Sequence, residues 1–168
     1  MGHVNPEQDA QEMLTIYWAK KDGTIPLPVD PIAIAEKAGI KVLTAVLEPN
    51  VSGMLFMKPG SDPEIYLSQS DSYNRQRFTC AHELGHWNKR VTEGQESAHV
   101  VDYRGPLSTT GGDPQERYAN GFAAALLMPA PEVLRLKRHG YGPIAMADKL
   151  RVSPEAASFR IANLVVLR

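Results

Sequence analysis

Near the middle of the chain stands the run Cys80-Ala81-His82-Glu83-Leu84-Gly85-His86. It contains the pattern His-Glu-x-x-His, and two histidines four residues apart lie on one face of a helix, where both imidazoles can reach one metal ion. The glutamate then lies where a hydrolase needs a general base to take the proton of an attacking water. The run therefore predicts a zinc-dependent peptide hydrolase with Glu83 as catalytic base. The alternative is a chance occurrence of the pattern on a solvated helix.

The residues around this run favour the metal site over chance. A helix is predicted from about residue 71 or 72 to about residue 90, and apolar side chains flank the histidines on two sides. One flank consists of Cys80, Leu84, Trp87 and Val91, and the other of Phe78, Ala81 and Gly85. Such a helix should be largely buried, and burial without a ligand would leave its polar groups unsatisfied. Cys80 lies opposite the histidines, so we expect it to pack as a small apolar residue.

A catalytic zinc ion takes three protein ligands and leaves one position open, so a third ligand is needed besides His82 and His86. Glu116 is the candidate, because it begins a strongly helical segment whose Ala119 and Ala123 lie on the same face. Small residues there, facing Gly85, would let the two helices approach closely. The alternative is an ordinary acidic residue in the first turn of a helix, where the helix dipole favours it.

Asn120 lies one helical turn after Glu116 and points to the same side. Its side-chain oxygen can accept a hydrogen bond from the ring of His82, which is the support that metal-binding histidines usually need. The expected site therefore comprises His82, His86 and Glu116 as metal ligands, Glu83 as base and Asn120 behind the first histidine. We expect one zinc ion per chain, with another divalent metal as the alternative.

The rest of the chain predicts an α+β fold of zincin-like type, with a small, mostly antiparallel sheet of about three strands packed by five to seven helices. The expected strands are 40–46, 52–58 and 64–68, with a further short strand at 99–103 as an option in the irregular stretch 91–115. The expected helices are about 6–22, 31–38, 71–90, 116–128, 131–139, 142–150 and one that opens at residue 153. We expect one domain, residues 1–168, in which 131–168 has a spacing like that of a helix-turn-helix.

Composition excludes several classes of protein. A chain of 168 residues with 43% hydrophobic and 22% charged residues suits one globular domain, and its net charge of −1 gives no basic field for nucleic acid or anionic membranes. No apolar run has the length of a membrane span, and we see no signal peptide. One cysteine cannot form an internal disulfide. We therefore expect a soluble cytoplasmic protein.

Two longer stretches resemble the ImmA/IrrE family of metallopeptidases. They are Arg75-Gln76-Arg77-Phe78-Thr79-Cys80-Ala81-His82-Glu83-Leu84-Gly85-His86 and Glu116-Arg117-Tyr118-Ala119-Asn120-Gly121-Phe122-Ala123-Ala124-Ala125-Leu126-Leu127-Met128-Pro129. The segments 29–40 and 151–157 are also similar, so the likeness covers nearly the whole chain from about residue 10.

The resemblance implies a zincin-like peptidase in which His82, His86 and Glu116 bind zinc and Glu83 is the base. It also implies a partner, a helix-turn-helix repressor or antitoxin, which the protein cleaves or whose cleavage it provokes. Such a pair would belong to a phage or mobile element, a stress response or a toxin–antitoxin system. We expect no C-terminal sensing domain of the kind that some relatives carry. One alternative is a zinc-stabilised module that sequesters such a repressor without cutting it.

Further expectations concern the substrate and DNA. An extended substrate strand should pair with an exposed sheet edge near the metal helix, at 52–58 or 64–68. Stabilisation of the oxyanion could come from His99, Tyr103, Arg104 or Tyr118, among which the sequence does not choose. DNA binding by the C-terminal region is a second alternative, but its last helix offers only Arg160 as a basic side chain, so packing of two core helices is the preferred interpretation.

Overall fold

The structure is a computed structural model that describes residues 5–103 and 113–166. The described part has an α+β fold of seven helices and four strands, as the sequence predicts. The helices are α1 (Pro6–Tyr17), α2 (Pro31–Lys37), α3 (Tyr73–Thr92), α4 (Pro114–Leu127), α5 (Ala130–Arg138), α6 (Pro143–Leu150) and α7 (Pro154–Val166). The strands are β1 (Lys41–Ala45), β2 (Val51–Met57), β3 (Glu64–Ser68) and β4 (Ala98–Tyr103).

The four strands form one mixed sheet in the order β1-β3-β2-β4. β1 and β3 are parallel, whereas β2 is antiparallel to both β3 and β4. The sheet is thus mostly antiparallel but has a fourth strand, which is the optional strand of the sequence analysis with Ala98 added. The expectation that β2 or β3 offers an exposed edge is wrong, because both lie inside the sheet. The edges of the described sheet are β1 and β4. The order of strands depends on pairing between segments far apart in the chain, so the sequence of one strand does not predict it.

Side-chain caps set the beginnings of the helices. Asn5, Asp30 and Asp113 each accept backbone N–H groups at the start of α1, α2 and α4, and a proline follows each of them at the first helical position. At the start of α3 the Ser72 side chain accepts the backbone N–H of Arg75, here with no proline after it. The Asp113-Pro114 pair explains why α4 begins at residue 114 and not at 116, so that Glu116 lies within its first turn.

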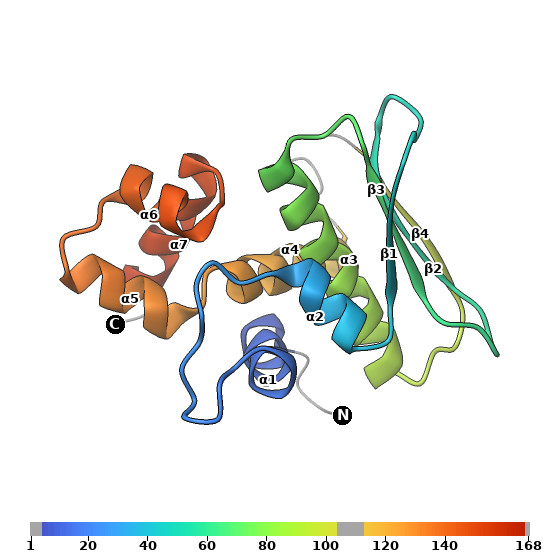
Figure 1. Ribbon diagram of the computed structural model, residues 1–168, viewed down its shortest axis with the longest axis horizontal. Helices are drawn as coiled ribbons and strands as arrows, with labels where there is room; N and C mark the ends of the chain where they lie inside the picture. Colours follow the sequence, from blue (N-terminus) through green and yellow to red (C-terminus); the bar gives the residue numbers. More distant parts are fainter. Residues whose placement is uncertain (1–4, 104–112, 167–168) are drawn as a thin grey trace.

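The helices α1 to α4 lie on one side of the sheet, and α3 packs between the sheet and α4 (Figure 1). The core between these layers contains Leu55 and Ile65 from the sheet, Leu84 from α3 and Phe122 from α4, all fully buried. The predicted apolar flank of α3 is correct for Cys80 and Leu84 but wrong for Val91, whose side chain is 49% exposed. Val91 is in the last turn of α3, where it lines an open groove beside Trp87 and the β2–β3 turn.

The C-terminal helices α5 to α7 gather at the end of the molecule opposite the sheet (Figure 1). Two buried arginines connect them to the rest. Arg77 of α3 donates hydrogen bonds to the carbonyl oxygens of Val29, Leu150 and Arg151. Arg160 of α7 donates to the carbonyl of Met128 and forms a bidentate ion pair with Glu7 of α1 at 2.7 Å.

This ion pair bears on the DNA-binding alternative. The basic side chain that the last helix offers, Arg160, is buried and engaged by Glu7, so it does not face solvent where a phosphate could reach it. The observation favours packing of α6 and α7 as core helices over DNA contact.

Among residues 5–103 and 113–166, no helix is both long enough and apolar enough to span a membrane.

Candidate metal centre

Helix α3 presents three polar side chains from its buried middle. His82, Glu83 and His86 are 3%, 0% and 1% exposed, so this part of the helix is not a solvated surface. The two imidazoles lie on one face, with their Nε2 atoms 3.1 Å apart. This burial removes the alternative in which the pattern occurs by chance on a solvated helix.

Helix α4 brings Glu116 to the same point. Its two carboxylate oxygens lie 3.2 Å from Nε2 of His82 and 3.1 Å from Nε2 of His86. The close approach of the helices depends on Gly85, because a Cβ there would lie 3.1 Å from Ala119 Cα and from Phe122 Cβ. The predicted contact between Gly85 and the small-residue face of α4 is therefore present at Ala119.

The spacing of these donor atoms suits a divalent metal ion. One ligand atom from each of His82, His86 and Glu116 lies within 4.8 Å of the others. Tetrahedral zinc with bonds of about 2.0–2.1 Å separates its ligand atoms by about 3.3 Å, close to the 3.1 Å between the two Nε2 atoms and to the distance from each Nε2 atom to its nearer carboxylate oxygen of Glu116. Two imidazole nitrogens and one carboxylate are also a donor set that zinc accepts. These residues fit the ion that the sequence pattern predicts.

Asn120 lies behind the first histidine, as expected from its position one turn after Glu116. Its Oδ1 atom is 2.9 Å from Nδ1 of His82, which directs Nε2 of that ring toward Glu116. An amide oxygen is an acceptor, so Nδ1 of His82 carries the proton in this contact. The nitrogen with the available lone pair is then Nε2, the atom that faces the proposed metal position.

Glu83 occupies a narrow space between α3 and β2. Both of its carboxylate oxygens are buried, and neither has a hydrogen-bond partner among the described residues. Gly53 of β2 makes room for Thr79 of α3, since a Cβ at Gly53 would overlap the Thr79 side chain, whereas it would lie in ordinary contact with Glu83 Oε1 at 3.5 Å. Burial is the main cause that raises the pKa of Glu83 to about 8. The charges of Asp102 and Glu116 add to this rise, and the charge of His82 partly opposes it. A buried carboxyl of this kind has the proton affinity of a general base.

The other titratable groups form one electrostatic unit. Burial alone would lower the pKa of His82, but the hydrogen bond with Glu116 and the charge of Glu83 raise it above its ordinary value. For His86 burial prevails and lowers the pKa. Hydrogen bonds from the protonated ring of His82 and from His86 hold the pKa of Glu116 far below its usual range.

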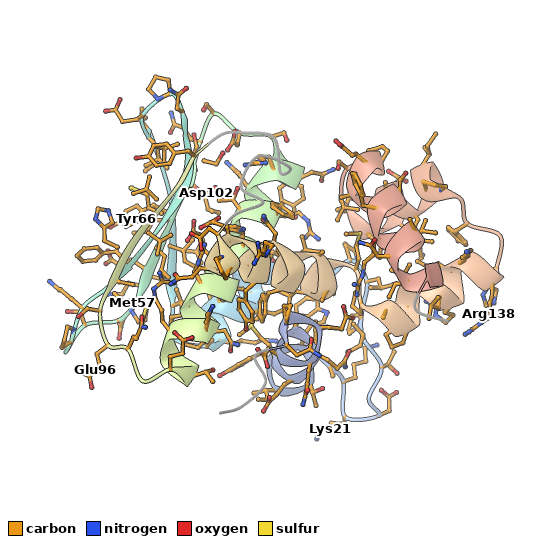
Figure 2. All side chains as sticks on the ribbon, turned by 180° about the vertical axis from the view of Figure 1, so that it is seen from behind. Lys21, Met57, Tyr66, Glu96, Asp102 and Arg138 are labelled. Atoms are coloured by element: carbon orange, nitrogen blue, oxygen red, sulfur yellow. The ribbon has the colours of Figure 1, made fainter. Side chains whose placement is uncertain are left out.

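Two charged residues near the site were missed by sequence reasoning. Asp102 of β4 pairs with Gly53 across the sheet, and Figure 2 shows it on the side that carries the helices. Burial raises its pKa, and it influences both His82 and Glu83. Its position depends on strand pairing, which the sequence does not reveal. Arg90 contacts His86, and here the spacing of four residues was an available signal.

Two of the four candidates for oxyanion stabilisation lie away from the candidate metal ligands. His99 is exposed and packs edge-on against Phe56, with ring centroids 5.9 Å apart. Tyr118 donates a hydrogen bond to Asp9 of α1 at 2.7 Å and accepts one from Asn88, on a different side of α4 from Glu116. Strand parity and helix rotation turn both of these candidate side chains away from Glu116. Tyr103 is 66% exposed at the end of β4, and Arg104 lies outside the described residues.

Comparison with known protein families matches residues 35–162 to the IrrE N-terminal-like domain, Peptidase_M78. The chain belongs to this metallopeptidase family. The match spans most of the chain and includes α3 and α4, the two helices that hold the candidate metal centre of this Peptidase_M78 domain. It confirms the resemblance to ImmA/IrrE proteins. A search of curated proteins found no match.

Proposed function

We propose that this Peptidase_M78 domain is a zinc-dependent endopeptidase. The observation that carries the proposal is the convergence of His82, His86 and Glu116 beside the buried carboxyl of Glu83. The three residues would hold the ion, which supplies Lewis-acid chemistry by polarising a peptide carbonyl and making a water molecule more acidic. Asn120 keeps the ring of His82 in the orientation that metal binding needs.

Glu83 supplies the proton transfers of this mechanism. Its carboxylate takes a proton from the attacking water as the new C–O bond forms, and it passes that proton to the leaving amine nitrogen as the C–N bond breaks. Its buried position supports this role, because a carboxyl without hydrogen-bond partners among the described residues is free to accept and release a proton.

We further propose that the substrate lies extended along β4. Within the described sheet, β4 pairs on one side with β2 and is an edge strand on the other. An edge strand can add a peptide through main-chain hydrogen bonds, and alternate side chains of that peptide then face the site. Asp102 places this edge near the metal ligands, since its charge acts on His82 and Glu116 acts on it. The choice of a helix-turn-helix repressor or antitoxin as substrate rests on the resemblance to ImmA/IrrE proteins.

The test compares wild type with Glu83→Gln on a purified helix-turn-helix repressor of the kind that the resemblance to ImmA/IrrE proteins implies. We expect wild type to cleave the repressor and Glu83→Gln to retain zinc but lose cleavage. Glu93→Gln is the matched control, because Glu93 is an exposed residue at the end of the same helix and should cleave normally when substituted. Cleavage by Glu83→Gln at the wild-type rate would show that the base assignment is wrong. If both proteins inactivate the repressor and leave it uncut, the protein sequesters its partner.

A further inference from the structure

The two candidate histidine ligands have opposite neighbours at their second ring nitrogen. Nδ1 of His82 faces an acceptor, the amide oxygen of Asn120, at 2.9 Å. Nδ1 of His86 faces a donor, Nη1 of Arg90, at 3.4 Å. The same Nη1 atom donates to the backbone carbonyl of His86 at 3.2 Å, so Arg90 is held close to the ring.

A guanidinium group has only N–H donors and no acceptor. It can therefore form a hydrogen bond with Nδ1 of His86 only when that nitrogen has no proton. In neutral imidazole the proton is then on Nε2, where Glu116 Oε1 lies 3.1 Å away and can accept it. A ring in this tautomer offers no lone pair at Nε2 to a metal ion.

Metal binding through Nε2 requires the other tautomer, with the proton on Nδ1. That N–H would point at the N–H groups of Arg90, and the cation would also lie beside a ring that carries a divalent ion. His82 has no such conflict, because Asn120 accepts the proton that metal binding places on Nδ1. The two histidines thus differ in how readily they become ligands.

We propose that Arg90 is a positioning residue that weakens metal binding by stabilising the non-ligand tautomer of His86. This inference rests on the proposed metal site and concerns its affinity. Gln115 takes part, since its Oε1 accepts a hydrogen bond from Arg90 Nη2 at 3.1 Å and Gln115 precedes the ligand Glu116. Arg90 thereby joins α3 to the start of α4, and it must leave Nδ1 of His86 for the site to bind its ion well.

The experiment measures the Kd for Zn²⁺ by competition with a chromophoric chelator. In Arg90→Gln the side-chain oxygen replaces donors with an acceptor for Nδ1 of His86, and we expect zinc to bind roughly tenfold more tightly, at the low end of measured effects for groups that support metal ligands. Gln115→Ala leaves the charge of Arg90 in place but releases its anchor, so a smaller gain in affinity is expected. Gln115 is exposed, and this variant should fold even if the first does not.

Lys89→Met is the matched control, because it removes one positive charge from the neighbouring position, where Lys89 lies over the Tyr118 ring and away from the histidines. Its Kd should equal that of wild type. Unchanged or weaker zinc binding in both Arg90→Gln and Gln115→Ala would overturn the role of Arg90 while leaving the peptidase proposal intact. A wild-type protein that binds no zinc would overturn the metal site itself, and this inference with it.

Discussion

Substitution of Gly85 by alanine tests whether the contact between α3 and α4 sets the geometry of the metal centre. The added Cβ would lie 3.1 Å from Ala119 Cα and Phe122 Cβ and 3.2 Å from Phe122 Cδ1. Carbon atoms in contact prefer about 3.5–4.0 Å, so the helices must separate by about 0.5 Å at this point. Glu116 lies one turn from Ala119 on the same helix and would move with it. Metal sites tolerate errors of about 0.2 Å in ligand distance, so the third ligand is displaced beyond this limit.

Two quantities should respond. Zinc binding should weaken by roughly tenfold, measured by chelator competition, because the Glu116 ligand no longer reaches the ion at a proper distance. Overpacking costs about 1–3 kcal/mol, and the better helix propensity of alanine offsets about 1 kcal/mol of it. The net loss of up to about 2 kcal/mol lowers the melting temperature by up to about 8 °C in a chain of this size, measured by calorimetry in EDTA.

Gly121→Ala is the control for this prediction. It has the same gain in helix propensity and a comparable close contact, but its Cβ meets the ring of Pro6 on α1 at 3.1 Å and not the metal helix. Its zinc affinity should match that of wild type. If Gly85→Ala also binds zinc with the wild-type Kd, the close approach of α3 and α4 does not position Glu116, and the reasoning is wrong.

Three other perturbations have defined outcomes. Asn120→Ala should weaken zinc binding by about 10–100-fold, measured by chelator competition, because Nδ1 of His82 loses its acceptor; equal affinity would refute the supporting role. Arg77→Leu should lower the free energy of unfolding in urea by about 3 kcal/mol or more, since three carbonyls lose a charged donor, whereas the exposed Arg138→Leu should change it little. Burial raises the pKa of Glu83 from 4.5 to about 8. In EDTA, the stability that depends on the protonated Glu83 carboxyl should therefore be present below pH 4.5 and be lost as the pH rises through about 8. Glu83→Gln should lack that part of the decline between pH 5 and pH 9 in urea unfolding; the same decline in both proteins would contradict the shift.

The sequence predicts the helical part of the site well, because its geometry is local. His82 and His86 share a face through the helical period, and Glu116 and Asn120 follow the same rule on their own helix. Contact between the two helices was predictable from Gly85 and Ala119, since small residues permit a close approach. The structure places all of these side chains together.

Features that depend on strand pairing were not predictable in this way. The order of the strands makes β4 an edge strand and places β2 and β3 inside the sheet. The sequence of each strand taken alone does not distinguish an edge position from an inner one. Asp102 reaches the site because it pairs with Gly53, which is far away in sequence. His99 turns outward by the parity of the same strand, against Phe56. Such contacts depend on the register between paired strands, because a shift of one residue would turn every side chain of a strand to the other face of the sheet.

Metal content per chain tests the central claim most directly. Wild type and Glu116→Ala, purified at neutral pH and dialysed against zinc, should be compared by elemental analysis. The proposal predicts about one zinc ion per wild-type chain and its loss in Glu116→Ala, because a histidine pair alone lacks the third ligand of a catalytic site. A wild-type chain without metal, or a variant that keeps its metal in full, would contradict the site formed by His82, His86 and Glu116.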